Sequence, residues 1–164
     1  MGIETFPVVE KHGTYDFFVV AEWKWLTKYL GEIDTFAKAM GLTPLRDFVN
    51  YSRNDAIADS SEKDVQETEG KAELRNGVYY IHSQVLWSSE DRWFEPEKAL
   101  ETVRGVLEYL NSQGDNTMKF EYEEDGVTCF FEDDDEKTYS LKALERVLSL
   151  INEEGKRFYL KVSV

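Results

Sequence analysis

The fold of this chain is decided by residues 94–164, which read FEPEKALETVRGVLEYLNSQGDNTMKFEYEEDGVTCFFEDDDEKTYSLKALERVLSLINEEGKRFYLKVSV. Apolar residues recur every three or four positions over 96–114 and 140–155. Three shorter parts, 118–122, 127–131 and 158–164, are apolar or alternate apolar with polar residues. A period near 3.6 predicts an amphipathic helix and a period of two predicts a strand. The predicted order is therefore helix, strand, strand, helix, strand.

Local signals mark where these elements begin and end. Pro96 suits the first position of a helix, because its missing N–H would be unpaired there in any case. Ser140 is the predicted N-cap of the second helix, and Gly155 its C-terminal residue. Asp125 and Gly126 tolerate positive φ and predict a hairpin turn between the two central strands.

An upstream hairpin extends this order. Asn76-Gly77 separates the apolar run 71–74 from the apolar run 78–86, and the second run is predicted to be one strand that contains His82. Residues 78–164 then follow the βαββαβ order of a ferredoxin-like arrangement, an antiparallel sheet with two helices on one face. In the closing strand, the apolar residues Phe158, Leu160 and Val162 alternate with Tyr159 and Lys161.

The N-terminal part reads as one strand followed by helices. Apolar and aromatic residues alternate over 14–22 and predict a strand, and Trp23 and Trp25 continue the alternation. Helical spacing then predicts a helix that ends at Gly41 and is interrupted at Gly31. A further short helix is expected after Thr43-Pro44. The chain is therefore predicted to contain a helical N-terminal part.

The predicted organisation is one α+β domain over residues 1–164. It comprises a unit of strand and helices over 1–53 and an α+β body over 71–164. Between them, 54–70 is polar without a sustained apolar period and is predicted to be an exposed loop.

Composition predicts a folded, cytoplasmic protein without cofactors. Hydrophobic residues make up 41% of the chain and aromatic residues 14%, which suffices for a core. Cys129 is the only cysteine, so an intrachain disulfide is impossible and a reducing compartment is expected. No signal peptide is recognised at the N-terminus, and the longest apolar run, 17–21, is too short to span a membrane.

Charge is the most biased feature of the sequence. The net charge is -14, and nine of the sixteen residues from 121 to 136 are acidic while none is basic. Such charge disfavours nucleic acid and anionic membranes as partners and is compatible with a basic protein. Solubility alone would also account for it. The candidate partner-binding residues are Glu132, Asp133, Asp134, Asp135 and Glu136, together with Trp87, Arg92 and Trp93.

The segment 87–94 is the second candidate surface. It joins a strand to a helix, where recognition loops are common, and it contains two Trp and one Arg, residue types enriched in interface hot spots. An alternative interpretation is that Trp93 and Phe94 attach the following helix to the core, with Arg92 paired to an acid.

No catalytic or metal-binding residue is predicted. His12, His82 and Cys129 lack the spacing of metal ligands, and the acidic run lacks the pattern of an EF-hand loop. No nucleophile elbow, Walker A loop or dinucleotide fingerprint is present. Paired carboxylates remain an open alternative, because an acidic chain always offers pairs.

These observations favour a non-catalytic binding or regulatory protein that uses an acidic surface, for example an inhibitor of a basic protein. Two alternatives stay open: a small-molecule-binding protein or enzyme with a pocket near 87–94, and a structural module that binds a divalent cation such as calcium through 132–136. Partner identity and oligomeric state do not follow from the sequence.

Overall fold

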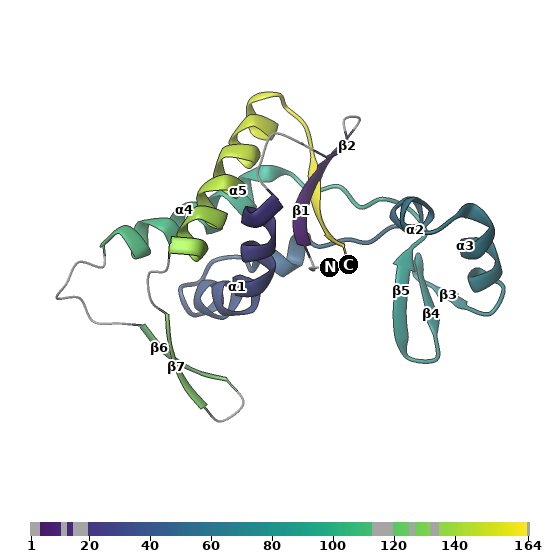
Figure 1. Cartoon of the computed structure of the whole chain (residues 1–164), viewed down its shortest axis with the longest axis horizontal. Helices are drawn as coiled ribbons and strands as arrows, with labels where there is room; N and C mark the ends of the chain where they lie inside the picture. Colours follow the sequence, from purple (N-terminus) through teal and green to yellow (C-terminus); the bar gives the residue numbers. More distant parts are fainter. Residues whose placement is uncertain are drawn as a thin grey trace.

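The α+β class is confirmed by a computed structural model, which describes residues 4–10, 13–14, 20–112, 120–124, 127–131 and 135–163 (Figure 1). Its helices are α1 (Val20–Ala39), the 3-10 helix η1 (Leu45–Phe48), α2 (Arg53–Asp59), α3 (Glu62–Glu69), α4 (Pro96–Ser112) and α5 (Asp135–Glu153). Its strands are β1 (Glu4–Val9), β2 (Gly13–Thr14), β3 (Glu73–Arg75), β4 (Val78–Ile81), β5 (Gln84–Ser88), β6 (Phe120–Glu124), β7 (Val127–Phe131) and β8 (Phe158–Ser163).

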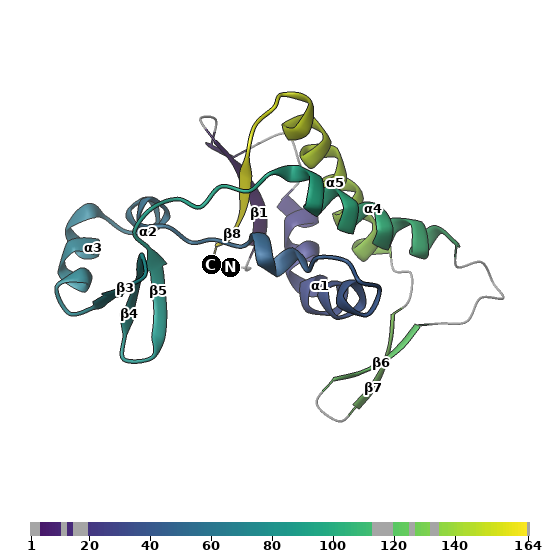
Figure 2. The same ribbon diagram turned by 180° about the vertical axis from the view of Figure 1, so that it is seen from behind.

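The larger part of the structure, here called the body, comprises the described residues outside 50–92. In it, α4 packs along α5, and α1 packs against both α5 and β1 (Figures 1 and 2). One apolar core joins these helices to β8. Its largest fully buried side chains are Leu26, Ile33, Phe36, Leu45, Leu110, Leu141, Leu144, Leu148, Ile151, Phe158 and Leu160. Burial of these apolar stripes is what holds the helices on the strands.

The two predicted long helices are confirmed. Pro96 is the first residue of α4, and the predicted apolar stripes of α4 and α5 are buried. Gly155 follows α5 with a φ of 67°, a left-handed conformation that suits glycine at a helix C-terminus. The N-cap prediction was wrong, because α5 already begins at Asp135. Ser140 lies buried inside the helix, where its hydroxyl donates to the Lys137 carbonyl at 2.8 Å.

The described strands form three antiparallel sheets, not one ferredoxin-like sheet. Strand β8 pairs with β1 along its whole length, from Val9 opposite Phe158 to Glu4 opposite Ser163. The other sheets are β3-β4-β5 and the two-stranded ribbon β6-β7. No strand was predicted at the position of β1. Because β1 pairs with β8, the predicted order of elements does not close into the predicted sheet.

The N-terminal prediction was partly wrong. The predicted helix beyond residue 22 is confirmed, but α1 already begins at Val20, within the predicted strand, and it continues past Gly31 without a break. Residues 15–19 of the predicted strand lie outside the described residues, and β2 covers only 13–14. Trp23 is buried at helical spacing from the core residues of α1, and this packing favours helix over strand.

Residues 50–92 form a second compact part, here called the small lobe. The predicted loop 54–70 is not a loop, because it forms α2 and α3. Ser52 caps α2 in a capping box with Asp55, and the Ser61 hydroxyl accepts from the Asp64 N–H at 3.1 Å. The caps and the burial of Ala56 and Val65 account for helices in a polar sequence.

The sheet of the small lobe contains two turns where one was predicted. The predicted hairpin at Asn76-Gly77 is confirmed, with φ values of 50° and 77°. The predicted strand 78–86 is instead divided into β4 and β5 by a turn at His82, whose φ is 55°. Downstream, β6 and β7 pair as predicted, with Glu124 opposite Val127, while 125–126 lie outside the described residues.

Candidate functional site

The small lobe joins the body through two connectors, residues 49–52 and 88–95. Both run beside β8, along the edge that is not paired with β1 (Figures 1 and 2). Single bridges attach Val49 to Leu160 and Phe94 to Phe158. The Asn50 N–H also donates to the Leu160 carbonyl at 2.9 Å. The junction between the lobe and the body is therefore built on the strand that is central to the core.

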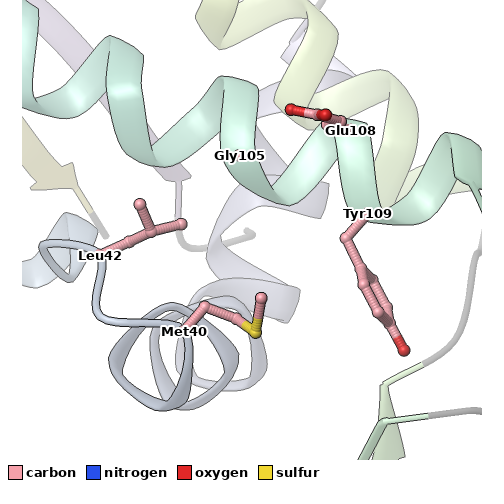
Figure 3. A pocket seen from close by; sticks show the side chains of 5 residues that line it. All are labelled: Met40, Leu42, Gly105, Glu108 and Tyr109. Atoms are coloured by element: carbon pink, nitrogen blue, oxygen red, sulfur yellow. The ribbon is translucent and has the colours of Figure 1, made fainter.

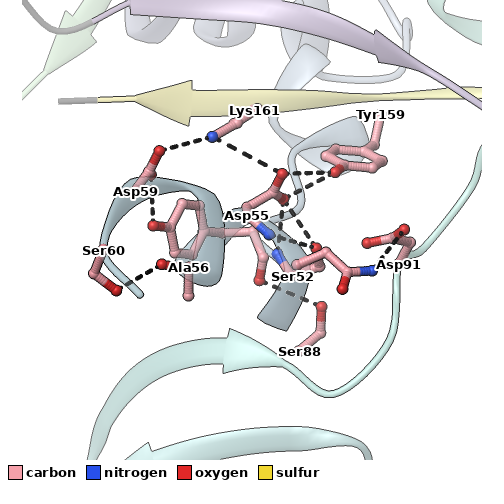
Figure 4. A network of polar contacts seen from close by, with 11 residues as sticks. Ser52, Asp55, Ala56, Asp59, Ser60, Ser88, Asp91, Tyr159 and Lys161 are labelled. Carbon is pink, nitrogen blue, oxygen red and sulfur yellow. Dashed lines mark hydrogen bonds and ion pairs between the residues drawn. The ribbon is translucent and has the colours of Figure 1, made fainter. Parts of the chain in front are cut away.

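The Asp55 carboxylate lies at the centre of this junction (Figure 4). It is 8% exposed and accepts from the Ser52 N–H at 2.9 Å and the Ser52 hydroxyl at 3.1 Å. The Tyr159 hydroxyl, from β8, is 2.9 Å from each oxygen of Asp55. One side chain thus completes the cap of α2 and also connects the small lobe to the body.

A second set of contacts lies beside the first. The Lys161 ammonium donates to Asp59 at 3.0 Å and is 3.9 Å from Asp55. The Tyr51 hydroxyl donates to the other oxygen of Asp59 at 2.7 Å. Lys161 is only 8% exposed although its side chain is charged. Helix α2 covers this face of β8, and its carboxylates supply the polar partners that a buried ammonium needs.

This arrangement shifts the ionisation of three side chains. Burial raises the pKa of Tyr159, and the neighbouring Asp55 charge adds to the effect. Burial and the hydrogen bond to Asp59 likewise raise the pKa of Tyr51. Partial burial acts to raise the pKa of Asp59, but hydrogen bonds from Tyr51 and Lys161 and the Lys161 charge outweigh it and lower this pKa. The phenols therefore stay protonated as donors while Asp59 stays ionised.

The lowered pKa of Asp59 predicts a pH-dependent contribution to stability. A carboxyl with a lowered native pKa contributes stability above its unfolded pKa of about 3.9, and loses it as the pH falls through the native value. Asp59→Asn should therefore be less stable than the parent at pH 7, and the difference should shrink below about pH 4. Urea denaturation from pH 2 to 7 measures it. A difference that does not vary with pH would contradict the assigned ionisation.

Three polar atoms at the junction are buried without a hydrogen-bond partner among the described residues: Asn50 Nδ2, Trp87 Nε1 and Asp91 Oδ1. The other polar atoms of Asn50 and Asp91 are occupied, since Asn50 Oδ1 accepts from Ser88 at 3.0 Å and Asp91 Oδ2 accepts from Asn54 at 3.4 Å. Buried polar groups are usually paired, so three exceptions in one region are notable.

The aromatic candidates of the segment 87–94 lie at this junction. The Trp93 ring is 5.0 Å from the Tyr159 ring, and Trp87 is 6.5 Å from Tyr79 within the small-lobe sheet. Arg92 is exposed. Phe94 packs edge-on against Phe48 at 5.6 Å and joins the core. The structure thus brings Trp87 and Trp93 to the region of the polar cluster.

The acidic candidates lie elsewhere. Glu132, Asp133 and Asp134 are outside the described residues, and Asp135 is the first residue of α5. Glu136 accepts from Lys28 at 3.3 Å and from the Tyr29 hydroxyl at 3.5 Å, so it connects α5 to α1. The start of α5 follows the β6-β7 ribbon, at the opposite end of the molecule from the small lobe (Figure 1). The two predicted groups are therefore not brought together.

Two hollows lie on the body and involve none of these candidates. One, of about 380 Å³, is lined by Met40, Leu42, Gly105, Glu108 and Tyr109 (Figure 3). The other, of about 490 Å³, is lined by Lys142, Glu145, Arg146, Ser149, Leu150 and Glu153 on the surface of α5. Within the described ranges, no three His, Cys, Asp or Glu side chains are placed to hold a metal ion. In the same ranges, no helix is long and apolar enough to cross a membrane.

Sequence reasoning missed the residues at the centre of the junction. Asp55 is 104 residues from Tyr159 in the sequence, and no local pattern links it to Tyr159 or Lys161. One local signal was present. Ser52 and Asp55 have the spacing of a capping box, which would have predicted the start of α2.

The fold and the junction define an α+β protein with two lobes joined by a buried polar cluster. Comparisons with family models, with curated proteins and with solved structures found no match to this chain. The function that we propose for this chain therefore rests on its sequence and geometry alone.

Proposed function

We propose that this protein is a non-catalytic binding or regulatory protein whose acidic segment, residues 121–136, engages a basic protein partner. An inhibitor of the immunity type, which neutralises a basic enzyme by covering it, is the concrete version. The observation that supports the proposal is the concentration of nine acidic and no basic side chains in sixteen residues of a chain with net charge -14. Such a field accelerates encounter with a positively charged surface and orients it.

The position of the acidic segment supports the same proposal. Strands β6 and β7 form a two-stranded ribbon that contacts α1 through β6 and extends beyond the helices of the body (Figures 1 and 2). In its register, Glu121 is opposite Phe130 and Glu123 opposite Thr128, so both glutamates belong to the paired part of the ribbon. A two-stranded hairpin is only marginally stable by itself, so a partner that covers it would stabilise it.

The polar cluster at the junction supports a structural role more than a catalytic one. Asp55, Tyr159 and Lys161 are each bonded to other protein groups, and each is at least nine-tenths buried. A general acid or base must reach a substrate atom, and these groups instead bond one another. We therefore assign the cluster to holding the two lobes together. A cytoplasmic location and the absence of nucleic-acid binding belong to the same proposal, and they rest on the single cysteine and the net charge.

Partner capture with a matched charge control tests the proposal. The test variant carries Glu132→Gln, Asp133→Asn and Asp134→Asn. The control carries Glu101→Gln, Glu108→Gln and Glu153→Gln, which removes the same charge from exposed positions of α4 and α5. Tagged parent, test and control proteins are incubated with lysate of the source cell, and the retained basic protein is purified and titrated. The test variant should bind it about tenfold or more weakly, and the control should bind like the parent.

Salt separates a specific charged interface from general attraction. Binding by the parent should weaken steeply between about 0.05 and 0.3 M salt, because the Debye length falls below the range of surface pairs. The test variant should show a shallower dependence. Equal weakening by the test and control variants would assign the effect to net charge alone. Retention of no basic protein, or of the same one by all three proteins, would reject the proposed surface.

A further inference from the structure

We propose that the small lobe, residues 50–92, is a hinged unit that a polar latch closes onto β8. The latch consists of Asp55 and Asp59 on α2 together with Tyr159 and Lys161 on β8. When the latch breaks, the lobe is expected to swing on its two connectors while the body stays folded. This inference does not depend on the proposed function, because it concerns contacts far from the acidic segment.

The distribution of the apolar core supports a hinge. The main cluster of buried apolar residues joins α1, η1, α4, α5 and β8, and it includes no residue of 50–92. The small lobe buries Ala56 and Val65 instead. Apolar burial therefore does not join the lobe to the main core. Where apolar burial is small, two parts separate at low cost, because water replaces polar contacts more readily than apolar ones.

The small lobe has its own internal contacts. Its three strands form one sheet, Ser88 of β5 is bridged to Ser52 within the lobe, and Arg53 on α2 forms an ion pair with Glu69 on α3 at 2.9 Å. The Ser52 capping box of α2 lies within the lobe and needs nothing from β8. The lobe is thus expected to keep its shape when it leaves β8. The chain passes between the lobe and the body only at the two connectors (Figure 2).

The latch and the groups that oppose it lie in the same junction. Closure is favoured by the Tyr159 hydrogen bonds to Asp55 at 2.9 Å and by the Lys161 contact with Asp59 at 3.0 Å. It is opposed by Asn50 Nδ2, Trp87 Nε1 and Asp91 Oδ1, which are buried without partners among the described residues. Asn50 and Asp91 lie in the two connectors. Trp87 precedes Ser88, the last residue of β5, at which the second connector begins. Opening would hydrate the unpartnered atoms in the connectors, which lowers the free-energy cost of breaking the latch.

Breaking the latch without damaging α2 is the direct test. Tyr159→Phe with Lys161→Met removes the polar side-chain contacts from β8 to α2, but leaves Ser52 and Asp55 to cap α2. Arg53→Met is the matched control, since it also removes a cation paired with a carboxylate of the lobe, but within the lobe. Spin labels at Lys63→Cys on α3 and Glu101→Cys on α4, both exposed positions, report the separation of lobe and body in a Cys129→Ser background.

The expected result is a narrow distance distribution in the parent and the control, and a broad one in the latch variant. Hydrogen exchange should rise at the amides of the junction while α4, α5 and β8 keep their protection. An unchanged distribution in the latch variant would overturn the proposal, and so would loss of protection over the whole chain at once. If the double variant does not fold, Tyr159→Phe alone is the test variant, because it keeps the ring beside Trp93 and the Lys161 contact with Asp59. This variant must broaden the distance distribution measurably, or the proposal fails.

Discussion

Asp55→Ala is expected to lower the stability of the small lobe by about 4 kcal/mol, the scale for removing one partner of a buried charged group. The carboxylate accepts from the Ser52 N–H and hydroxyl and from Tyr159, and it lies 3.9 Å from the Lys161 ammonium. Alanine leaves these donors in a buried junction without their acceptor. It also removes one half of the capping box of α2, which contributes about 1 kcal/mol in typical helices.

Native-state hydrogen exchange at the amides of α2, β4 and β5 measures this loss, because it reports the local opening of one part of a protein. Asp64→Ala is the control, since Asp64 is an exposed aspartate in the first turn of α3. The stability of the lobe in Asp55→Asn should lie between its values in Asp55→Ala and Asp64→Ala. The amide oxygen of asparagine still accepts from Tyr159 but lacks the charge. If Asp55→Ala destabilised the lobe no more than Asp64→Ala does, the central role of Asp55 would be refuted.

Phe36→Ala should destabilise the body by about 4 kcal/mol, the usual range for deleting a buried aromatic ring. Phe36 is 0% exposed in α1, and its ring lies 4.6 Å from the ring of Tyr109 on α4. The substitution removes the transfer free energy of the ring and leaves a cavity between α1 and α4. It also removes the aromatic pair, which typically contributes a further 0.5–1.5 kcal/mol at about this separation.

Urea denaturation followed by far-ultraviolet circular dichroism measures the loss of stability in Phe36→Ala, because most of the helix is in the body. Tyr139→Ala serves as the control, since this aromatic side chain on α5 is 52% exposed and should change stability by less than about 1 kcal/mol. Phe36→Leu should recover roughly half of the loss by refilling part of the cavity. Equal midpoints for Phe36→Ala and Tyr139→Ala would contradict the position of Phe36 in the core.

The parts of the fold that follow from short-range signals could be predicted. Pro96 and Gly155 mark helix ends by their own backbone chemistry, and Asn76-Gly77 forms its turn because both residues adopt positive φ. The apolar stripes of α4 and α5 are buried as their spacing predicted. Each signal acts within a few residues, so it is present in the sequence wherever the chain later packs.

The candidate site could be predicted only in part. Trp87 and Trp93 were singled out by residue type, and they do lie at the junction. The acidic segment was recognised by composition, and its role as a binding surface stays a prediction. Asp55, Tyr159 and Lys161 were not recognised, because their significance comes from one another and they are brought together only by the docking of α2 on β8.

By itself, the sequence determined the class of fold, the helices α4 and α5, the hairpin turn at Asn76-Gly77 and the concentration of negative charge. Only the tertiary structure decided which strands are neighbours and which faces are covered. The pairing of β1 with β8 joins opposite ends of the chain, and no local pattern encodes a partner so distant. Alternation shows that a strand has one apolar face, but it cannot show that a second lobe will cover the other. Only the docking of α2 therefore explains why Tyr159 and Lys161 lie buried.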